Sequence, residues 1–151
     1  MNLTERQAEC LKVMESLPFV DLTTIDRMGF PSTRAMLNLR NTQRYPHMVA
    51  LHEVEENPLA VYLTTNASSE KVNEIQQDPR ACLYYCEYGA FLGILLQGMV
   101  EIVTDKTIRQ KAWQKGWEVY YPKGDADYVL LRFVPNKLKV YSNFSVATEM
   151  L

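Results

Sequence analysis

The feature that most limits the possible folds is a series of short segments rich in β-branched and aromatic residues, separated by brief turns. Strands are predicted at residues 19–25, 33–39, 58–64, 80–87, 92–103, 128–134 and 137–143, the last two joined by a turn at Pro135 and Asn136. Helices are expected only at 1–17, near 69–77 and at 106–117. This pattern predicts a mainly β fold, an antiparallel barrel or sandwich with peripheral helices, formed by residues 1–151 as a single domain.

Helix start signals mark two of the predicted helices. Thr4 and Gln7 form the pattern of a capping box, and Asp105 is suited to cap the helix that follows it. Trp113 and Trp117 lie one turn apart in that last helix. We expect both rings to pack the helix onto the barrel.

Composition and charge exclude two classes of partner. The net charge of −2 and an isoelectric point near 5.7 leave no broad basic surface, so nucleic acid is not expected as a partner. The longest apolar run, residues 90–96, is too short to cross a bilayer, and the first ten residues lack the pattern of a signal peptide. We therefore expect a cytoplasmic protein without membrane association.

The cysteines and histidines do not form a recognisable metal site. An odd number of cysteines, three, argues against a disulfide framework. Cys82 and Cys86 fall on one face of a predicted strand, but their spacing without nearby histidines is a poor metal signature, and buried thiols are expected. His47 and His52 lie within residues 41–57, which show no clear periodicity. We expect both to be surface or loop residues, in a loop with one short strand at most.

Small hydroxyl groups and one lysine gather where a predicted strand meets a predicted helix, in the sequence TNASSEK at 65–71. Helix N-termini favour anions, hydroxyls donate hydrogen bonds, and an ammonium group can reach a phosphate oxygen. If the backbone there is extended, Thr65, Ser69 and Lys71 point one way and Thr64, Ser68 and Glu70 the other. The alternative is that a serine only caps the helix and Lys71 is solvated.

The predicted strand at 33–39 has two faces of different character. Alternation places Ala35, Leu37 and Leu39 on one side and Arg34, Met36 and Asn38 on the other. The second face is expected to be polar and accessible.

The residues that carry these patterns resemble a known family. TNASSEK looks like the phosphate-binding segment of the pyridoxamine 5'-phosphate oxidase-like flavoproteins, which fold as split β-barrels of antiparallel, Greek-key type. Arg34 in TRAMLNL matches the family's strand arginine, and Gly98 matches the glycine of its long central strand. YYPKGDADYVLLRFVP at 120–135, with Trp113 before it, is similar to the general stress protein 26 branch of the family.

The resemblance implies a homodimer with FMN in a cleft between the subunits. It assigns the phosphate to Arg34, Ser69 and Lys71, with Thr64 and Thr65 beside the ribityl chain or the ring. The neighbouring residues complete the candidate cofactor-binding set: Ala35, Met36, Leu37 and Glu70. No catalytic residue and no metal ligand is identified.

Three departures from the oxidase pattern bear on the substrate. Glu70 stands where the oxidases have a basic residue, Leu39 where they have a lysine, and Gly93 near the position of a glutamine. A true pyridoxamine phosphate oxidase is therefore not expected. The resemblance favours a small FMN-dependent oxidoreductase that acts on an electron-poor small molecule, such as a nitroaromatic compound. The alternatives are a non-enzymatic, stress-related flavin or ligand binder, and a barrel without FMN that holds another anion or a haem-like ligand.

Overall fold

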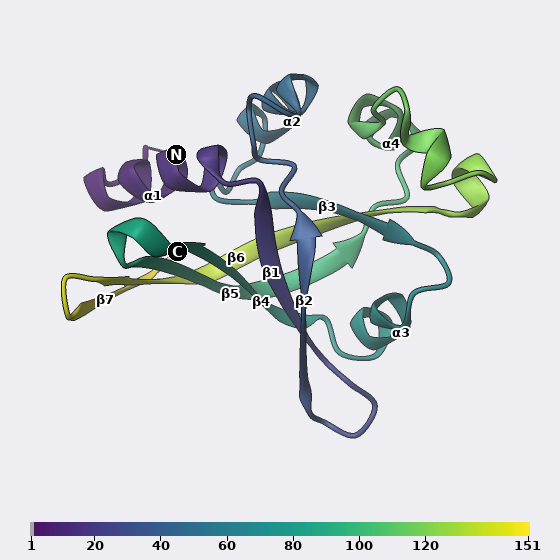
Figure 1. The fold of residues 1–151 in the computed structure, drawn as a ribbon. Coiled ribbons are helices and arrows are strands. Elements are labelled where there is room, and N and C mark those ends of the chain that lie inside the picture. Colours follow the sequence, from purple (N-terminus) through teal and green to yellow (C-terminus); the bar gives the residue numbers. More distant parts are fainter. Residues whose placement is uncertain (1) are drawn as a thin grey trace.

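A computed structural model describes residues 2–151, which form one antiparallel sheet of seven strands around a barrel-like core (Figure 1). The strand order is β2-β1-β4-β5-β6-β3, with β7 paired to β6. β2 and β3 end this order and approach each other without pairing in the described residues, so the barrel stays split there. The strands are β1 Phe19–Ile25, β2 Pro31–Leu37, β3 Val61–Asn66, β4 Arg80–Glu87, β5 Leu92–Ile102, β6 Tyr128–Ser142 and β7 Ser145–Met150. The predicted mainly β, antiparallel fold is confirmed.

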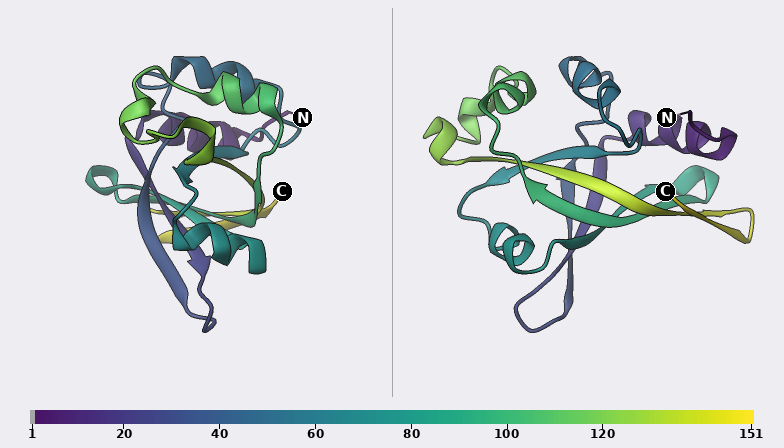
Figure 2. Two further views of the ribbon diagram at one scale, coloured as in Figure 1. Left: turned by 90° about the vertical axis from the view of Figure 1, so that its right-hand side faces the viewer. Right: turned by 180° about the vertical axis from the view of Figure 1, so that it is seen from behind.

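The helices lie around the sheet rather than inside it. They are α1 Glu5–Ser16, α2 Val49–Glu53, α3 Glu70–Gln77 and α4 Lys106–Ala112, with short 3-10 turns at Pro46–Met48, Tyr88–Ala90, Trp117–Val119 and Gly124–Ala126. Figures 1 and 2 show α1, α2 and α4 together along one side of the strands and α3 by itself on the opposite side. No helix in residues 2–151 is both long and apolar enough to span a membrane.

Two apolar clusters hold these layers together. The larger lies inside the barrel, where α1 and α3 contribute Met14 and Ile75 to the inward residues of the strands. The smaller lies under α2 and α4 and is rich in aromatic rings. β3 serves both, because Leu63 faces the first cluster and Tyr62 the second. The strand is therefore covered on both faces and its position is fixed.

The helix-start predictions hold, and the tryptophans pack as expected. Thr4 and Gln7 form the capping box, and Asp105 accepts hydrogen bonds from the backbone at the start of α4. Trp113 and Trp117 meet edge to face, with centroids 5.9 Å apart, in the second cluster. They are not on one helix, however, because α4 ends at Ala112 rather than near residue 117.

The end of the chain differs from the prediction of two strands. Residues 128–142 form one continuous strand, so the turn predicted at Pro135 and Asn136 is wrong. A bulge opposite Gln97 and Gly98 absorbs these residues instead. Asn136 is left out of the register, and its neighbour Pro135 lies opposite Gly98, at the bulge where a proline is tolerated. Gly98 is required, because a Cβ would lie 2.2 Å from the Val134 carbonyl oxygen.

Residues 46–53 are helical, within the segment 41–57 where a loop or short strand was predicted. A 3-10 turn and α2 occupy the segment. Both histidines were expected to be surface or loop residues. This is wrong for His52, which is buried in α2, while His47 is partly buried. His52 accepts a hydrogen bond from the Tyr62 backbone, which ties α2 to β3.

The cysteines and the predicted polar face also need correction. All three thiols are free, and Cys82 and Cys86 are partly exposed rather than buried, because they lie on the outward side of β4. The face that carries Met36 and Asn38 turns inward, so it is not accessible. The Asn38 amide is satisfied there by the carbonyls of residues 14 and 17.

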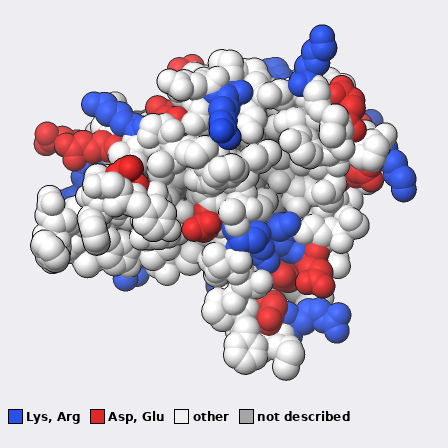
Figure 3. Space-filling view, in the orientation of Figure 1, with Lys and Arg blue, Asp and Glu red and all other residues white. Residues whose placement is uncertain are grey.

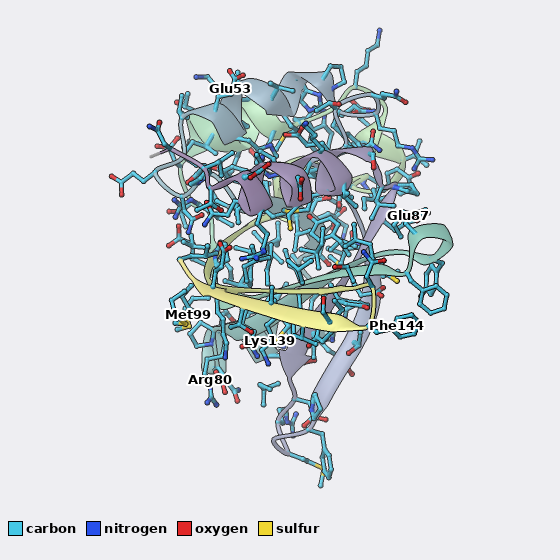
Figure 4. All side chains as sticks on the ribbon, turned by 90° about the vertical axis from the view of Figure 1, so that its left-hand side faces the viewer. Glu53, Arg80, Glu87, Met99, Lys139 and Phe144 are labelled. Carbon is cyan, nitrogen blue, oxygen red and sulfur yellow. The ribbon has the colours of Figure 1, made fainter. Side chains whose placement is uncertain are left out.

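The β4–β5 ladder pairs the full length of β4. Figure 4 shows Arg80 and Met99, which are register partners, at one end of it and Glu87 at the other, on the same side as Phe144. Tyr88, Phe91 and Phe144 are exposed at the tips of the two neighbouring hairpins. The charged cluster described below lies away from these tips, between β2 and α3.

Candidate functional site

The junction of β3 and α3 gathers three of the predicted site residues around one ammonium group. Thr65 is the next-to-last residue of β3, a turn follows at 67–68, and Ser69 takes the N-cap position of α3. The condition of an extended backbone over 65–71 is not met, because β3 ends at Asn66 and α3 begins at Glu70, in agreement with the helix predicted near 69–77. The turn nevertheless brings the groups together: Lys71 Nζ donates to Thr65 Oγ1 at 3.0 Å and to Ser69 Oγ at 2.6 Å.

Ser69 does not behave as an ordinary helix cap. Its side chain accepts no hydrogen bond from the first turn of α3, whereas Asp105 caps α4 with two such bonds. The Ser69 hydroxyl accepts from Lys71 instead, and Lys71 is partly buried. The alternative of a capping Ser69 beside a solvated lysine does not describe this junction.

Arg34 reaches the same region from β2, across the split in the barrel. Its guanidinium donates to Thr24 Oγ1 at 2.6 Å and forms an ion pair with Glu74 at 3.4 Å. The Thr24 hydroxyl in turn donates to the other Glu74 oxygen at 3.1 Å. Thr24 is fully buried and Glu74 nearly so, which holds Arg34 against the inner side of α3.

The electrostatic balance at this place is positive. Burial lowers the pKa of Lys71, the nearby charge of Arg34 lowers it further, and Glu74 opposes both effects. Among residues 2–151, Lys71 forms no ion pair, so two cations share one carboxylate. Figure 3 shows Lys and Arg atoms gathered between β2 and α3, with Asp and Glu atoms beside them toward the hairpin tip. We call Arg34, Thr65, Ser69, Lys71 and Glu74 the cation cluster.

Other predicted site residues lie outside the cation cluster. On β2, Ala35 is exposed, Met36 belongs to the barrel core and Leu37 packs against the second apolar cluster. Glu70 is exposed and lines a hollow of about 360 Å³ together with Asp26. Glu74 lines the same hollow, and Glu70 is not among the charges that shift the pKa of Lys71.

Thr64 is separated from Thr65 by the alternation of β3. It points toward the aromatic cluster under α4 and is 8% exposed. Its Oγ1 has no hydrogen-bond partner in the described residues. The Tyr121 hydroxyl lies near it, but the pair does not reach hydrogen-bond geometry. Thr64 therefore has a buried hydroxyl without a hydrogen-bond partner in the described residues, beside the aromatic cluster under α4.

Three further residues belong to this site and were not predicted from the sequence: Thr24, Ser32 and Glu74. Ser32 Oγ accepts from Arg34 at 3.2 Å. Glu74 carried a usable signal, because it lies three residues after Lys71 and so on the same side of a helix. Thr24 carried another, since it is the polar member of an alternating inward series with Val20 and Leu22.

A second cavity, of about 300 Å³, lies between α1 and α2 and contains another buried cation, Arg40. Arg40 is satisfied by the carbonyls of Pro58 and Ala60 and faces Glu15 at 3.7 Å. Glu15, Glu53 and Glu55 also line this cavity. The excess of carboxylates makes it unsuited to an anion.

The cation cluster can bind an oxyanion. A guanidinium, an ammonium group and two hydroxyls from three elements converge at the open edge between β2 and β3. Such groups match the oxygens of a phosphate monoester, and the N-terminus of α3 adds the positive end of its dipole. No acid, base or nucleophile in the cluster stands out as a catalytic group.

Comparison with known proteins agrees with these features. The sequence model described as "Pyridoxamine 5'-phosphate oxidase like" matches residues 31–150. The chain belongs to this family. No curated protein matches it.

Three solved structures illustrate the family fold. A Clostridium acetobutylicum protein related to general stress protein 26, of the pyridoxinephosphate oxidase family, is 27% identical, with a TM-score of 0.76 over 95% of this chain and 93% of its own. A pyridoxamine 5'-phosphate oxidase-related, FMN-binding protein from Nostoc punctiforme is 15% identical, with a TM-score of 0.64 over 100% and 99%. A heme-binding protein from Mycobacterium smegmatis is 13% identical, with a TM-score of 0.68 over 99% of this chain and 60% of its own. These neighbours identify the fold as a split barrel.

Proposed function

We propose that this family member binds FMN and anchors the cofactor's phosphate at the cation cluster. The observation that carries the proposal is the pair of partly buried cations, Arg34 and Lys71, which share the single carboxylate of Glu74. Two such charges without matching counter-ions are unfavourable unless an anion joins them. The FMN-binding relative from Nostoc punctiforme, which shares the fold, makes FMN the first anion to test.

The proposed contacts follow the chain around the site. Arg34, Ser69 and Lys71 hold the phosphate, and Thr65 supports Lys71 beside the ribityl chain. The β2 residues from Ala35 to Leu37 and Thr64 adjoin the rest of the cofactor, Met36 and Thr64 through their backbones, since their side chains are buried. FMN itself supplies hydride and electron transfer, so the protein has only to bind and orient it and to exclude water.

We further propose a homodimer with the cofactor between its subunits. The outward faces of β1 and β4 support this, because they present partly buried, mostly uncharged side chains such as Thr23, Cys82 and Tyr84. The three free thiols are compatible with the reducing cytoplasm, where we expect the protein to work. The dimer predicts that added FMN strengthens subunit association, which sedimentation velocity with and without FMN measures.

The activity we propose is that of a small flavin-dependent oxidoreductase with a small-molecule substrate, a nitroaromatic compound being the first candidate. Glu70 is exposed and Leu39 is buried, so neither replaces the basic residues that a pyridoxal phosphate substrate would need. The proposal therefore separates the cofactor from the substrate: the phosphate site serves FMN alone.

The decisive experiment is reconstitution with FMN. Wild-type protein should turn yellow and quench FMN fluorescence, whereas Arg34→Ala with Lys71→Ala should lose FMN while it keeps the weaker binding of riboflavin, which lacks the phosphate. Arg80→Ala with Lys123→Ala removes the same charge from exposed positions and should bind like wild type. Wild-type protein that stays colourless in excess FMN would overturn the proposal.

Two alternatives are separated by further measurements. Stopped-flow reduction of the bound flavin by a nicotinamide nucleotide, followed by reoxidation with nitroaromatic acceptors, tests the enzyme; a flavin that cannot be reduced leaves a flavin-binding protein with a stress-related role. The heme-binding relative raises a barrel with haem in place of FMN. A haem absorption band after incubation with haemin, without any FMN binding, would favour that case.

A further inference from the structure

Glu74 occupies an unexpected place for a residue beside a phosphate site. It lies on the inner side of α3 at 6% exposure, and its two oxygens meet the Arg34 guanidinium and the Thr24 hydroxyl. Its negative charge also acts on Lys71, one turn earlier on the same helix. The residue therefore acts on both cations of the cluster through its charge, and only a small part of it is exposed, in the hollow that Glu70 and Asp26 also line.

This carboxylate has two opposite effects. In the empty site it compensates two cations that repel each other and are partly removed from water, so it stabilises the folded chain. Toward an arriving phosphate it is a like charge, which opposes binding by Coulomb repulsion. The same group thus favours the empty site and weakens the filled one.

We propose that Glu74 is a built-in counter-ion that limits the affinity of the cation cluster for its anion and keeps the anion exchangeable. The inference rests on the proposed function, because it concerns the site assigned to the FMN phosphate. On binding, the phosphate shares Arg34 with Glu74 rather than finding it free. Each further negative charge on a ligand is disfavoured by the same carboxylate.

A purely structural role for Glu74 makes the opposite prediction. If the carboxylate served only to hold Arg34 in position, its loss would misplace the guanidinium and weaken anion binding. A counter-ion role predicts a folded chain that is less stable when empty but gains more from an anion. The change in anion affinity on loss of the carboxylate distinguishes the two roles, because a positioning role predicts a decrease and a counter-ion role an increase.

The test is Glu74→Gln, which keeps the shape and can still hydrogen-bond Thr24. We expect lower stability of the empty protein in urea, and FMN affinity about tenfold higher than that of wild type. Riboflavin affinity should be unchanged, since riboflavin carries no phosphate. The control is Glu53→Gln, an equal charge change at an exposed position on α2, outside the cation cluster, which should shift FMN affinity less than twofold.

Each result has a defined meaning. Glu74→Gln that binds FMN as wild type does, or more weakly, overturns the inference and leaves the FMN proposal intact. If wild-type protein fails to bind FMN, the proposed function fails, and stabilisation by inorganic phosphate then tests the inference alone. A larger phosphate effect in Glu74→Gln than in wild type upholds it, and an equal, smaller or absent effect overturns it.

A second variant covers the case in which Glu74→Gln does not fold. Lys71→Gln with Glu74→Gln removes one charge of each sign, so the cation excess of the single variant is relieved. Recovery of folding in the double variant supports the counter-ion role. A double variant that remains unfolded shows that Glu74 is needed for packing alone and overturns the inference.

Discussion

Two partly buried ion clusters in this protein combine cations and carboxylates in opposite proportions. At β3 and β6, one cation, Arg132, is shared by two carboxylates, Glu55 and Glu101, and the Tyr62 hydroxyl donates to Glu55 at 2.5 Å. We call this the carboxylate cluster. In the cation cluster, two cations share one carboxylate. In the carboxylate cluster every charged group forms an ion pair, whereas in the cation cluster Lys71 forms none within the described residues.

The difference separates a structural cluster from a binding site. Burial would raise the pKa of Glu55, but hydrogen bonds from Arg132 and Tyr62 outweigh it and lower the pKa. Burial lowers the pKa of Lys71 and the Arg34 charge adds to the effect, so its charged form is disfavoured in the fold. A cluster that stabilises its own charges holds the fold together, whereas one that does not is suited to a ligand.

The largest effect is expected in the carboxylate cluster. Arg132→Met leaves the Glu55 carboxylate, whose side chain is 6% exposed, without its cation, and should lower the free energy of unfolding by about 3 kcal/mol. Urea denaturation measures this. Arg80→Met is the control, since the Arg80 side chain is 73% exposed and solvent screens its pair with Asp78, so its loss should change stability far less. Equal losses in the two variants would remove the contrast between the clusters.

Acid should weaken the fold through His52, which borders the carboxylate cluster through Tyr62. Burial, and next the charge of Arg40, lower the pKa of His52 to about 3, although a hydrogen bond to the Met48 carbonyl opposes this. Between pH 6.5 and 3 the unfolded chain therefore binds a proton that the folded chain does not. The free energy of unfolding should decrease as the pH is lowered, by up to about 1.4 kcal/mol per pH unit.

His52→Gln isolates that contribution, because glutamine can still accept from the Tyr62 backbone but does not titrate. The stability difference between wild type and variant should shrink as the pH falls from 7 to 4. His47→Gln should leave the wild-type pH dependence in place. A wild-type-to-variant difference that stays constant over this range would contradict a buried neutral His52.

The cation cluster should respond in the opposite sense. Lys71→Met removes a partly desolvated charge that Arg34 repels, so the empty protein should keep its stability or gain slightly, since solvent screens part of the effect. Stabilisation by phosphate or FMN should be lost in the same variant. Thermal unfolding with and without ligand measures both. A Lys71→Met protein that is clearly less stable when empty would make the lysine a structural residue.

The sequence was sufficient where a local pattern decides the structure. The alternation of β1 and β4 marks their buried faces, and the capping pattern at Thr4 marks the start of α1. It failed where the partner is distant. Pro135 and Asn136 look like a turn until β5 supplies the opposite side of a bulge.

The site was predictable in its members but not in its assembly. Lys71, Ser69 and Thr65 are close in sequence, so their convergence could be anticipated, although it arises from a turn rather than an extended strand. Arg34 and Glu74 are 40 residues apart, and their pairing depends on how β2 meets α3. Alternation also cannot say which face of a strand is inside, which is why Asn38 was placed outside.

The smallest expected effect is also a sharp test of what Ser69 does. Ser69 holds an N-cap position, where replacement of a capping serine by alanine usually lowers stability by about 1 kcal/mol. Its hydroxyl accepts from Lys71 and caps nothing, so Ser69→Ala should change the stability of the empty protein by less than about 0.5 kcal/mol. Asp105→Ala, which removes two capping bonds from α4, should lose the usual amount. Because the Ser69 hydroxyl is engaged with the ammonium group, its loss should appear instead as weaker phosphate binding; a Ser69→Ala protein as destabilised as Asp105→Ala would return the residue to an ordinary cap.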